Sequence, residues 1–315
     1  MEKILILGVN GQDGSYLAEI ELKKGNQVWG LGRQKNSRWI DQKGNYNYIN
    51  IELNNIQKLN EILKSIKPDI VYHFAAMHGP SGYRYENAPE ETLTINSVTV
   101  EIVLEYIRKN DKNIKLVYAS SSKVFSKELE KYDENSLKES SCLYSLSKNI
   151  SQQLIDFYNQ EYQMQSSVVW LFNHESIRRP DGYFINKIAD LIVDGLKNKL
   201  NTKIMGNLNF WCDWGSAEEY MRIISEITRI KEIQNNNYVL ATGKTTNAYE
   251  LVNNLFRFYD LEPKKYIKDY DENLKIGKAP WYVDISKLEK AVKKQPLIGI
   301  EDIFKKMIDY KLNSY

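Results

Sequence analysis

Lys3-Ile-Leu-Ile-Leu7 and the adjoining Gly8-Val-Asn-Gly11-Gln-Asp-Gly14 decide the fold of this 315-residue chain. The apolar run has no polar alternation, which is typical of a parallel strand buried on both faces of a sheet. Gly8 suits a tight turn, Gly11 lets the backbone approach a pyrophosphate, and Gly14 lets the following helix pack closely. The stretch therefore predicts a dinucleotide-binding turn.

Strands and helices alternate beyond this turn. A helix is expected from about Gln12, followed by strands at Gln27–Gly32 and Ile70–Phe74, a helix at Thr92–Lys109 and a strand at Lys115–Tyr118. This order indicates βαβ units, and it predicts an α/β fold with a doubly wound parallel sheet of the Rossmann type.

Ligands of such sheets bind beyond the carboxyl ends of the strands. The helix that starts near Gln12 would turn its first amides towards the cofactor phosphates. Asp13 and Ala75 also fall at strand ends, and we expect both to line the cofactor site. The segment 77–90 has no clear periodicity and is expected to form a loop over the site.

The end of the second strand bears on the choice of dinucleotide. An NAD-preferring fold usually has an acidic residue there, which accepts hydrogen bonds from the ribose hydroxyls. This chain has Gly32-Arg33-Gln34-Lys35 instead. Two cations and no carboxylate would tolerate a 2′-phosphate, so Arg33 favours NADP(H), although neutral Gly32 excludes neither cofactor.

The chemistry is expected from Ser121, Tyr144 and Lys148. Tyr144 and Lys148 are four residues apart on a predicted helix, so their side chains share a face. An ammonium beside a phenol favours the phenolate, and we expect it to lower the pKa of Tyr144 towards neutrality. Lys148 can also bond the nicotinamide ribose, while Ser121 holds the substrate hydroxyl. The trio predicts hydride transfer to a nicotinamide with Tyr144 as the base.

Composition narrows the class of protein. The net charge is +2, from 43 Lys and Arg against 41 Asp and Glu, which gives no reason to expect binding to nucleic acid or to a membrane. The two cysteines, Cys142 and Cys212, and the three histidines form no cluster at metal-ligand spacing, so no metal is predicted. Few cysteines and the lack of a secretory or membrane-spanning pattern favour the cytoplasm.

Three further segments resemble a known family: Gly11-Gln-Asp-Gly-Ser-Tyr-Leu-Ala-Glu19, Leu171-Phe-Asn-His-Glu-Ser-Ile-Arg-Arg179 and Asp213-Trp-Gly215. Together with the glycine turn and the trio, they make the chain similar to the extended short-chain dehydrogenase/reductases. Within these it resembles the GDP-mannose 4,6-dehydratases, and the resemblance runs through most of the chain.

The resemblance implies a GDP-linked manno-configured sugar as substrate, with transient oxidation at C4 by a tightly retained NAD(H) or NADP(H). It further implies that Asn173 and Lys187 contact the nucleotide. Arg178 and Arg179 would lie near a tetramer contact shared with the cofactor, so a homotetramer is expected, with a dimer as the alternative.

One position departs from the family pattern. Dehydratases have Ser-Thr-Ser-Glu, in which the glutamate takes the C5 proton and helps to expel the C6 hydroxyl. Here Ser121, Ser122 and Lys123 occupy the last three of those positions and are expected to face the substrate. A protonated lysine is a poor base, and it could act only if desolvation lowered its pKa strongly. We therefore expect oxidation at C4 to survive and elimination of water to be lost.

Three functions compete at this point. The first is a 4-dehydrogenase that makes a stable 4-keto sugar nucleotide from a hexose or a heptose. The second is a true 4,6-dehydratase with another base, and the third is a non-catalytic nucleotide-sugar-binding subunit. A chain of this length favours two domains. We expect a dinucleotide-binding domain at 1–171 with about 213–240, and a smaller mixed α/β substrate domain at 172–212 and 241–315.

Overall fold

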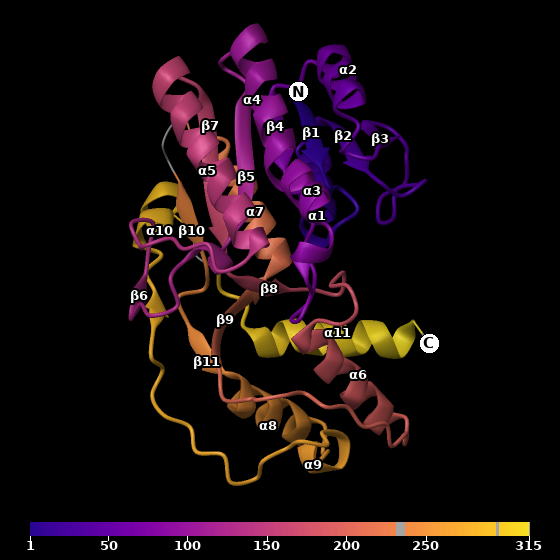
Figure 1. Ribbon diagram of the computed structural model, residues 1–315. Coiled ribbons are helices and arrows are strands. Elements are labelled where there is room, and N and C mark those ends of the chain that lie inside the picture. Colours follow the sequence, from indigo (N-terminus) through magenta and orange to yellow (C-terminus); the bar gives the residue numbers. More distant parts are fainter. Residues whose placement is uncertain (231–236, 294–295, 315) are drawn as a thin grey trace.

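A seven-stranded parallel sheet forms the centre of the computed structural model, which describes residues 1–230, 237–293 and 296–314 (Figure 1). The strand order is β10-β7-β5-β4-β1-β2-β3, so the chain winds outwards in both directions from β1 and β4. The predicted Rossmann-type fold is thereby confirmed. The strands are β1 (Lys3–Leu7), β2 (Gln27–Gly32), β3 (Tyr46–Asn50), β4 (Ile70–His73), β5 (Lys115–Ser121), β7 (Gln165–Leu171) and β10 (Tyr238–Leu240).

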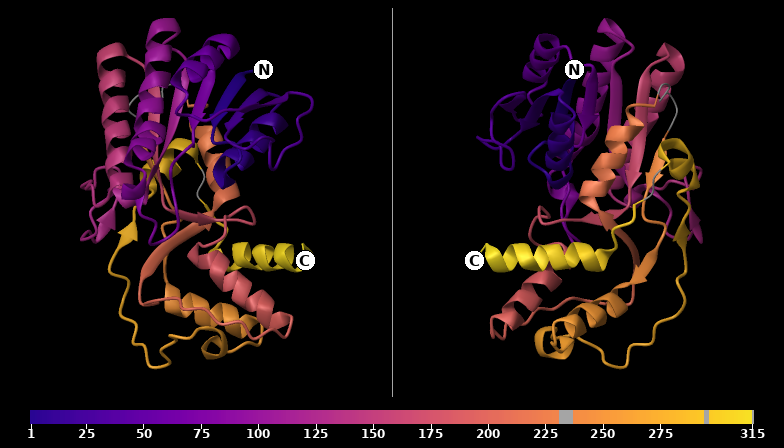
Figure 2. Two further views of the ribbon diagram at one scale, coloured as in Figure 1. Left: turned by 45° about the vertical axis from the view of Figure 1, so that its right-hand side comes forward. Right: turned by 180° about the vertical axis from the view of Figure 1, so that it is seen from behind.

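Helices cover both faces of this sheet (Figure 2). Alternate residues of β1 enter two separate cores, Ile4 and Ile6 on one face and Leu5 and Leu7 on the other, which explains the unbroken apolar run. One face packs against α2 (Ile56–Ile66), α4 (Thr99–Asn110) and α5 (Leu143–Tyr162); the other packs against α1 (Gln12–Lys23), α7 (Ala217–Ile227) and α10 (Ser286–Val292).

The helix expected at 92–109 is interrupted by a turn of π-helix. It runs as α3 (Pro89–Leu93), the π-helical turn η2 (Thr94–Val98) and then α4. Within η2 the carbonyl of Asn96 accepts hydrogen bonds from the Tyr118 hydroxyl at 3.0 Å and the Ser151 hydroxyl at 2.6 Å. Its side-chain oxygen accepts from the Met77 amide at 2.8 Å. The irregular turn thus fixes the start of the loop that follows β4.

A second group of elements lies below the carboxyl ends of the main strands in Figure 1. A three-stranded sheet of order β11-β9-β8 connects it to the main sheet. Its core includes Ile188, Trp214, Leu251 and Phe304. The elements are β8 (Asn173–Glu175), α6 (Phe184–Leu196), β9 (Trp211–Ser216), β11 (Thr245–Asn247), α8 (Ala248–Phe258), α9 (Pro263–Tyr266) and α11 (Ile300–Asn313).

The chain returns to the main sheet near its end. Strand β12 (Tyr282–Val283) pairs with β6 (Lys131–Tyr132), and Leu288 of α10 is buried in the core shared with α7. The smaller mixed α/β group is therefore present, while residues 282–292 pack with the main sheet instead of with that group. The domain boundaries themselves stay a prediction.

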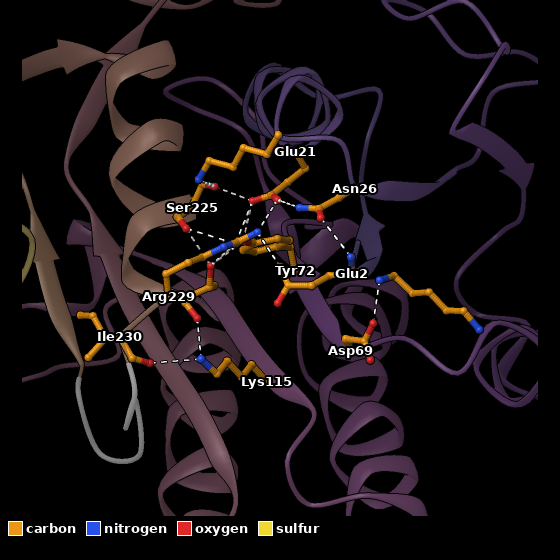
Figure 3. Close-up of polar contacts among 12 residues, drawn as sticks. Glu2, Glu21, Asn26, Asp69, Tyr72, Lys115, Ser225, Arg229 and Ile230 are labelled. Atoms are coloured by element: carbon orange, nitrogen blue, oxygen red, sulfur yellow. Dashed lines mark hydrogen bonds and ion pairs between the residues drawn. The ribbon is translucent and has the colours of Figure 1, made fainter.

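A network of charges joins the elements at the amino end of the sheet (Figure 3). Glu21 of α1 is fully buried and accepts hydrogen bonds from Asn26 at 2.7 Å, the Tyr72 hydroxyl at 3.0 Å and Arg229 at 2.7 Å. Arg229, which follows α7, also reaches Glu2 at 2.8 Å. Because each buried charge has an opposite charge beside it, the network holds α1, β4 and the end of α7 together.

Candidate functional site

The glycine turn has the close contacts that its sequence predicts. Gly8 has φ +89°, and a Cβ there would lie 2.7 Å from the Ala75 nitrogen. A Cβ on Gly14 would lie 2.4 Å from the Gly8 oxygen. Gly11, by contrast, has only that oxygen within 4 Å of a Cβ position, at 3.3 Å, and it gives α1 no side-chain cap. The first amides of α1 are thus placed to receive a pyrophosphate.

Gln12 and Asp13 connect this turn to the segment 174–176. The Ser176 hydroxyl donates to the Gln12 side-chain oxygen at 2.8 Å, and Asp13 Oδ1 lies 2.9 Å from His174 Nε2. Burial alone would raise the pKa of the Asp13 carboxyl, but the His174 ring and the Arg179 charge lower it to about 2. Asp13 is therefore a carboxylate at any ordinary pH.

The end of β2 leaves no room for an acidic side chain at position 32. A Cβ on Gly32 would lie 2.8 Å from the Tyr48 hydroxyl oxygen. The next residue, Arg33, is exposed, and the Asn50 side chain donates to its carbonyl at 3.0 Å. Neither Arg33 nor Lys35 forms an ion pair with another described residue. Both cations are therefore free to meet an anion.

Ser121, Tyr144 and Lys148 meet at the carboxyl end of β5. The Ser121 hydroxyl lies near enough to the Tyr144 phenol to lower its pKa. Lys148 is 2% exposed, and its ammonium donates to the Ala119 carbonyl at 2.7 Å and lies 5.7 Å from the centre of the Tyr144 ring. The three side chains that the sequence singled out are thus brought together, although their roles stay a prediction.

The expected effect of Lys148 on Tyr144 is wrong for the protein in this structure. Burial raises the pKa of the Tyr144 phenol, and the nearby Ser121 hydroxyl offsets this only in part. Burial likewise lowers the pKa of the Lys148 ammonium to about 7. Desolvation opposes charge on both groups, and here it outweighs the attraction between a phenolate and an ammonium.

Aromatic rings enclose Tyr144, which is 5% exposed. Tyr85, in the short helix η1 (Tyr85–Asn87), stacks on it with ring centres 5.2 Å apart. His78 from the same loop lies 5.1 Å away, and its Nδ1 is 2.7 Å from the Tyr183 hydroxyl. Residues 77–85 therefore form the expected loop over the site, and Tyr183 connects that loop to the second group of elements.

Lys123 also lies beside Tyr144. It belongs to the short helix η3 (Ser122–Val124), whose first turn is held by a bond from the Lys123 amide to the Ser121 hydroxyl at 3.2 Å. The ammonium lies 5.8 Å from the centre of the Tyr144 ring. It is exposed yet surrounded by protein atoms, and this partial desolvation lowers its pKa. A cation thus occupies the place where the resemblance to the dehydratases leads us to expect a carboxylate.

Asn173 and Lys187 lie farther along the second group. Asn173 is exposed on β8 near the Cys212 thiol, while Lys187 is half-buried one turn after Tyr183 in α6. No hydrogen bond or ring contact among the described residues joins either side chain to Tyr144. Any nucleotide contact by these residues therefore stays an expectation.

Arg178 and Arg179 are held within the chain. Arg178 stacks 4.0 Å from the Tyr16 ring centre and bonds Ser15, whereas Arg179 pairs with Glu175 at 2.7 Å and lies 4.7 Å from the Tyr183 ring centre. Arg179, fixed by its ion pair with Glu175, thereby packs against the Tyr183 ring and holds it in place.

No three His, Cys, Asp or Glu side chains within 1–230, 237–293 and 296–314 are grouped so that they could hold a metal ion. In the same part of the chain, no helix combines the length and the apolar character needed to cross a membrane.

Comparisons with known proteins agree with this geometry. A family model described as GDP-mannose 4,6 dehydratase matches residues 5–307. GDP-mannose 4,6 dehydratase 1 of Arabidopsis thaliana is 28% identical over 98% of this chain and 89% of its own length. Two solved structures share the fold, each with a TM-score of 0.80. One is dTDP-glucose 4,6-dehydratase of Bacillus anthracis with NAD, 16% identical over 99% of this chain and 96% of its own; the other is RMD of Pseudomonas aeruginosa with NADPH, 17% identical over 100% of each.

Proposed function

Because this chain belongs to the GDP-mannose 4,6 dehydratase family, we propose that it is an NAD(P)-dependent oxidoreductase acting at C4 of a GDP-linked manno-configured sugar. The sugar is a hexose or a heptose, and the product is the 4-keto sugar nucleotide with its C6 hydroxyl retained. The observation that carries this proposal is Lys123, whose ammonium lies beside the Tyr144 ring.

A dinucleotide fits the residues present. The turn at Gly8, Gly11 and Gly14 offers free amides at the start of α1, and the relatives' structures with NAD and NADPH share this fold. The Arg33 and Lys35 charges at the end of β2 are compatible with a 2′-phosphate, which favours NADP(H) without excluding NAD(H). When bound, an oxidised nicotinamide would supply the hydride acceptor that the reaction needs.

The residues of the chain would then bind the C4 hydroxyl and transfer its proton. Ser121 holds the C4 hydroxyl by a hydrogen bond, and Tyr144 removes its proton while hydride leaves C4. Burial keeps the Tyr144 phenol protonated, so it must give up that proton before it can act as the base. Lys148 has a pKa of about 7, so its neutral amine can take up the phenol proton near neutrality. Buried surroundings keep water away from the phenol.

Elimination of water needs one more group, a base for the C5 proton. At that position Lys123 presents an ammonium, which cannot accept a proton. The C6 hydroxyl should therefore stay in place after C4 has been oxidised.

The 4,6-dehydratase is the second candidate, and two observations favour it. The matching family and the Arabidopsis relative both carry that description. In addition, desolvation lowers the pKa of Lys123, which is the direction that a lysine acting as the missing base would require. A non-catalytic binding subunit, the third alternative, would have no use for the buried Tyr144 and Lys148 pair.

Product mass separates these functions. Purified protein is incubated with GDP-mannose and with a GDP-manno-heptose, and the products are weighed by mass spectrometry. Loss of two hydrogens, the C4 hydride and the proton of the C4 hydroxyl, with matching reduction of the cofactor supports the dehydrogenase. Loss of water supports the dehydratase and contradicts the proposal. If neither sugar nucleotide changes mass and denatured protein releases no dinucleotide, the result would count against any oxidoreductase.

A homotetramer, proposed from the family resemblance, is tested by light scattering.

A further inference from the structure

His78 is placed differently from the other two histidines. His73 is fully buried in β4 and bonds the Thr99 hydroxyl at 2.7 Å, and His174 is 8% exposed and lies between Asp13 and the Phe172 carbonyl. His78 is exposed to solvent, although protein atoms surround it on most sides. His78 is therefore the histidine of the three that a ligand beside Tyr144 could reach.

The ring of His78 has one nitrogen engaged and one available. Nδ1 is 2.7 Å from the Tyr183 hydroxyl, and the two rings stack with centres 5.7 Å apart. Nε2 makes no hydrogen bond with any residue in the described ranges. Burial, together with the charges of Lys123, Arg179 and Lys148, lowers the pKa of His78 to about 3, so the imidazole is neutral at physiological pH. A neutral ring can bond a hydroxyl group without adding a further cation.

The position of the ring indicates which part of a ligand it would meet. Its centre is 5.1 Å from that of Tyr144, the phenol proposed to exchange a proton with the reacting hydroxyl. Its partner Tyr183 directly precedes α6, which carries Lys187, a residue expected at the nucleotide. In the proposed function, His78 therefore lies beside the reacting C4 hydroxyl. It sits between the loop at residues 77–85 and the second group of elements.

We propose that His78 is a specificity-determining residue that hydrogen-bonds a hydroxyl group of the substrate sugar through Nε2, and that Tyr183 is the positioning residue that fixes the orientation of its ring. Arg179 supports Tyr183 in turn, through its contact with that ring at 4.7 Å and its ion pair with Glu175. The inference rests on the proposed function, because it assigns a contact to the sugar of that substrate.

The test compares a ligand that has the sugar with one that lacks it. Affinities for GDP-mannose and for GDP are measured by calorimetry for the wild type, His78→Phe, Tyr183→Phe and the double variant. Tyr83→Phe is the matched control, because Tyr83 packs in the same aromatic group while its hydroxyl bonds no described residue.

We expect His78→Phe to weaken GDP-mannose binding by about tenfold and to leave GDP binding unchanged, since one neutral hydrogen bond is lost. Tyr183→Phe should weaken GDP-mannose binding by about threefold, and it should add nothing in the His78→Phe background. Equal losses for GDP and GDP-mannose, no loss for either, or additive losses in the double variant would each overturn the inference. A wild type that binds neither ligand would instead overturn the proposed function, and the inference with it.

Discussion

The two ends of the main sheet differ in whether a buried charge has an oppositely charged partner. At the amino end, Glu21 is fully buried and meets Arg229 at 2.7 Å, and the hydroxyls and amide around them complete the hydrogen bonding (Figure 3). At the carboxyl end, Lys148 is equally enclosed, and no carboxylate of the described residues pairs with it. The paired charges serve stability, whereas the unpaired ammonium is an energetic cost that the fold accepts where chemistry is expected.

Glu21→Gln gives the largest expected effect, because it leaves Arg229 beside a neutral group in a buried network. The free energy of unfolding should fall by about 3 kcal/mol, at the low end for a broken buried pair since the Arg229 side chain is 32% exposed. Thermal and denaturant unfolding measure the loss. Glu2→Gln removes a 45% exposed partner of the same arginine and should cost less than about 1 kcal/mol. Equal losses in both variants would remove the distinction between buried and exposed pairs.

Tyr144→Phe tests the other end of the sheet. The change keeps the ring that stacks on Tyr85 and removes only the hydroxyl, so the protein should fold normally. Hydride transfer should fall about a hundredfold or more, which is about 2.7 kcal/mol in the barrier. Single-turnover formation of reduced nicotinamide measures the rate. A rate close to that of the wild type would exclude Tyr144 as the base.

Lys148→Met should change stability in the direction opposite to Glu21→Gln. With a native pKa of about 7 against an ordinary 10.5, the unfolded chain holds a proton between these values that the folded chain has released. Stability due to this group therefore rises with pH from about 7 to about 10.5. The variant lacks the penalty, so it should be more stable than the wild type by about 1 kcal/mol or more at pH 7, with the difference shrinking towards pH 10.

Denaturant titrations at several pH values, on protein freed of cofactor, check this expectation. The same variant should lose hydride transfer. A Lys148→Met protein that is less stable at pH 7 would show that the ammonium is better accommodated than its surroundings indicate.

Lys123→Glu has the smallest expected effect. It supplies a group able to accept the C5 proton, but the neighbouring residues of this chain surround a lysine, so we expect only partial dehydration. Mass spectrometry should detect a minor product lighter by one water, with solvent deuterium at C5, in the variant alone. Lys127→Glu makes the same charge change on an exposed neighbour and should give no such product. A wild type that itself releases water would replace the dehydrogenase with the dehydratase.

Local pattern sufficed for four strands of the main sheet, β1, β2, β4 and β5. The expected bounds of the strands at 3–7 and 27–32 agree with β1 and β2, because each run is apolar and ends at a glycine. Strands β3, β7 and β10 were missed; in β3, Tyr46-Asn-Tyr-Ile-Asn50, exposed asparagines interrupt the apolar residues. The π-helical turn in the helix expected at 92–109 was also missed, because its residues continue an ordinary helical pattern.

In the candidate site, too, some features could be predicted from the sequence and others could not. The spacing of Tyr144 and Lys148 and the position of Ser121 were enough to place the trio together. The pKa of Tyr144 was predicted in the wrong direction because it depends on enclosure by Tyr85 and its neighbours, which spacing cannot give. The contact between His78 and Tyr183 joins residues 105 positions apart, so only the folded chain reveals it.

The π-helical turn at Thr94–Val98 has a consequence for how this chain can vary. A π turn contains one residue more than the α-helical turn it replaces. Deleting a residue there would restore a regular helix but rotate the segment before it by about 100° relative to α4. Asn96 would then leave both Met77 and the Ser147 hydroxyl, which its side chain now reaches at 3.0 Å. Related chains should therefore exchange residues in this segment more freely than they gain or lose them.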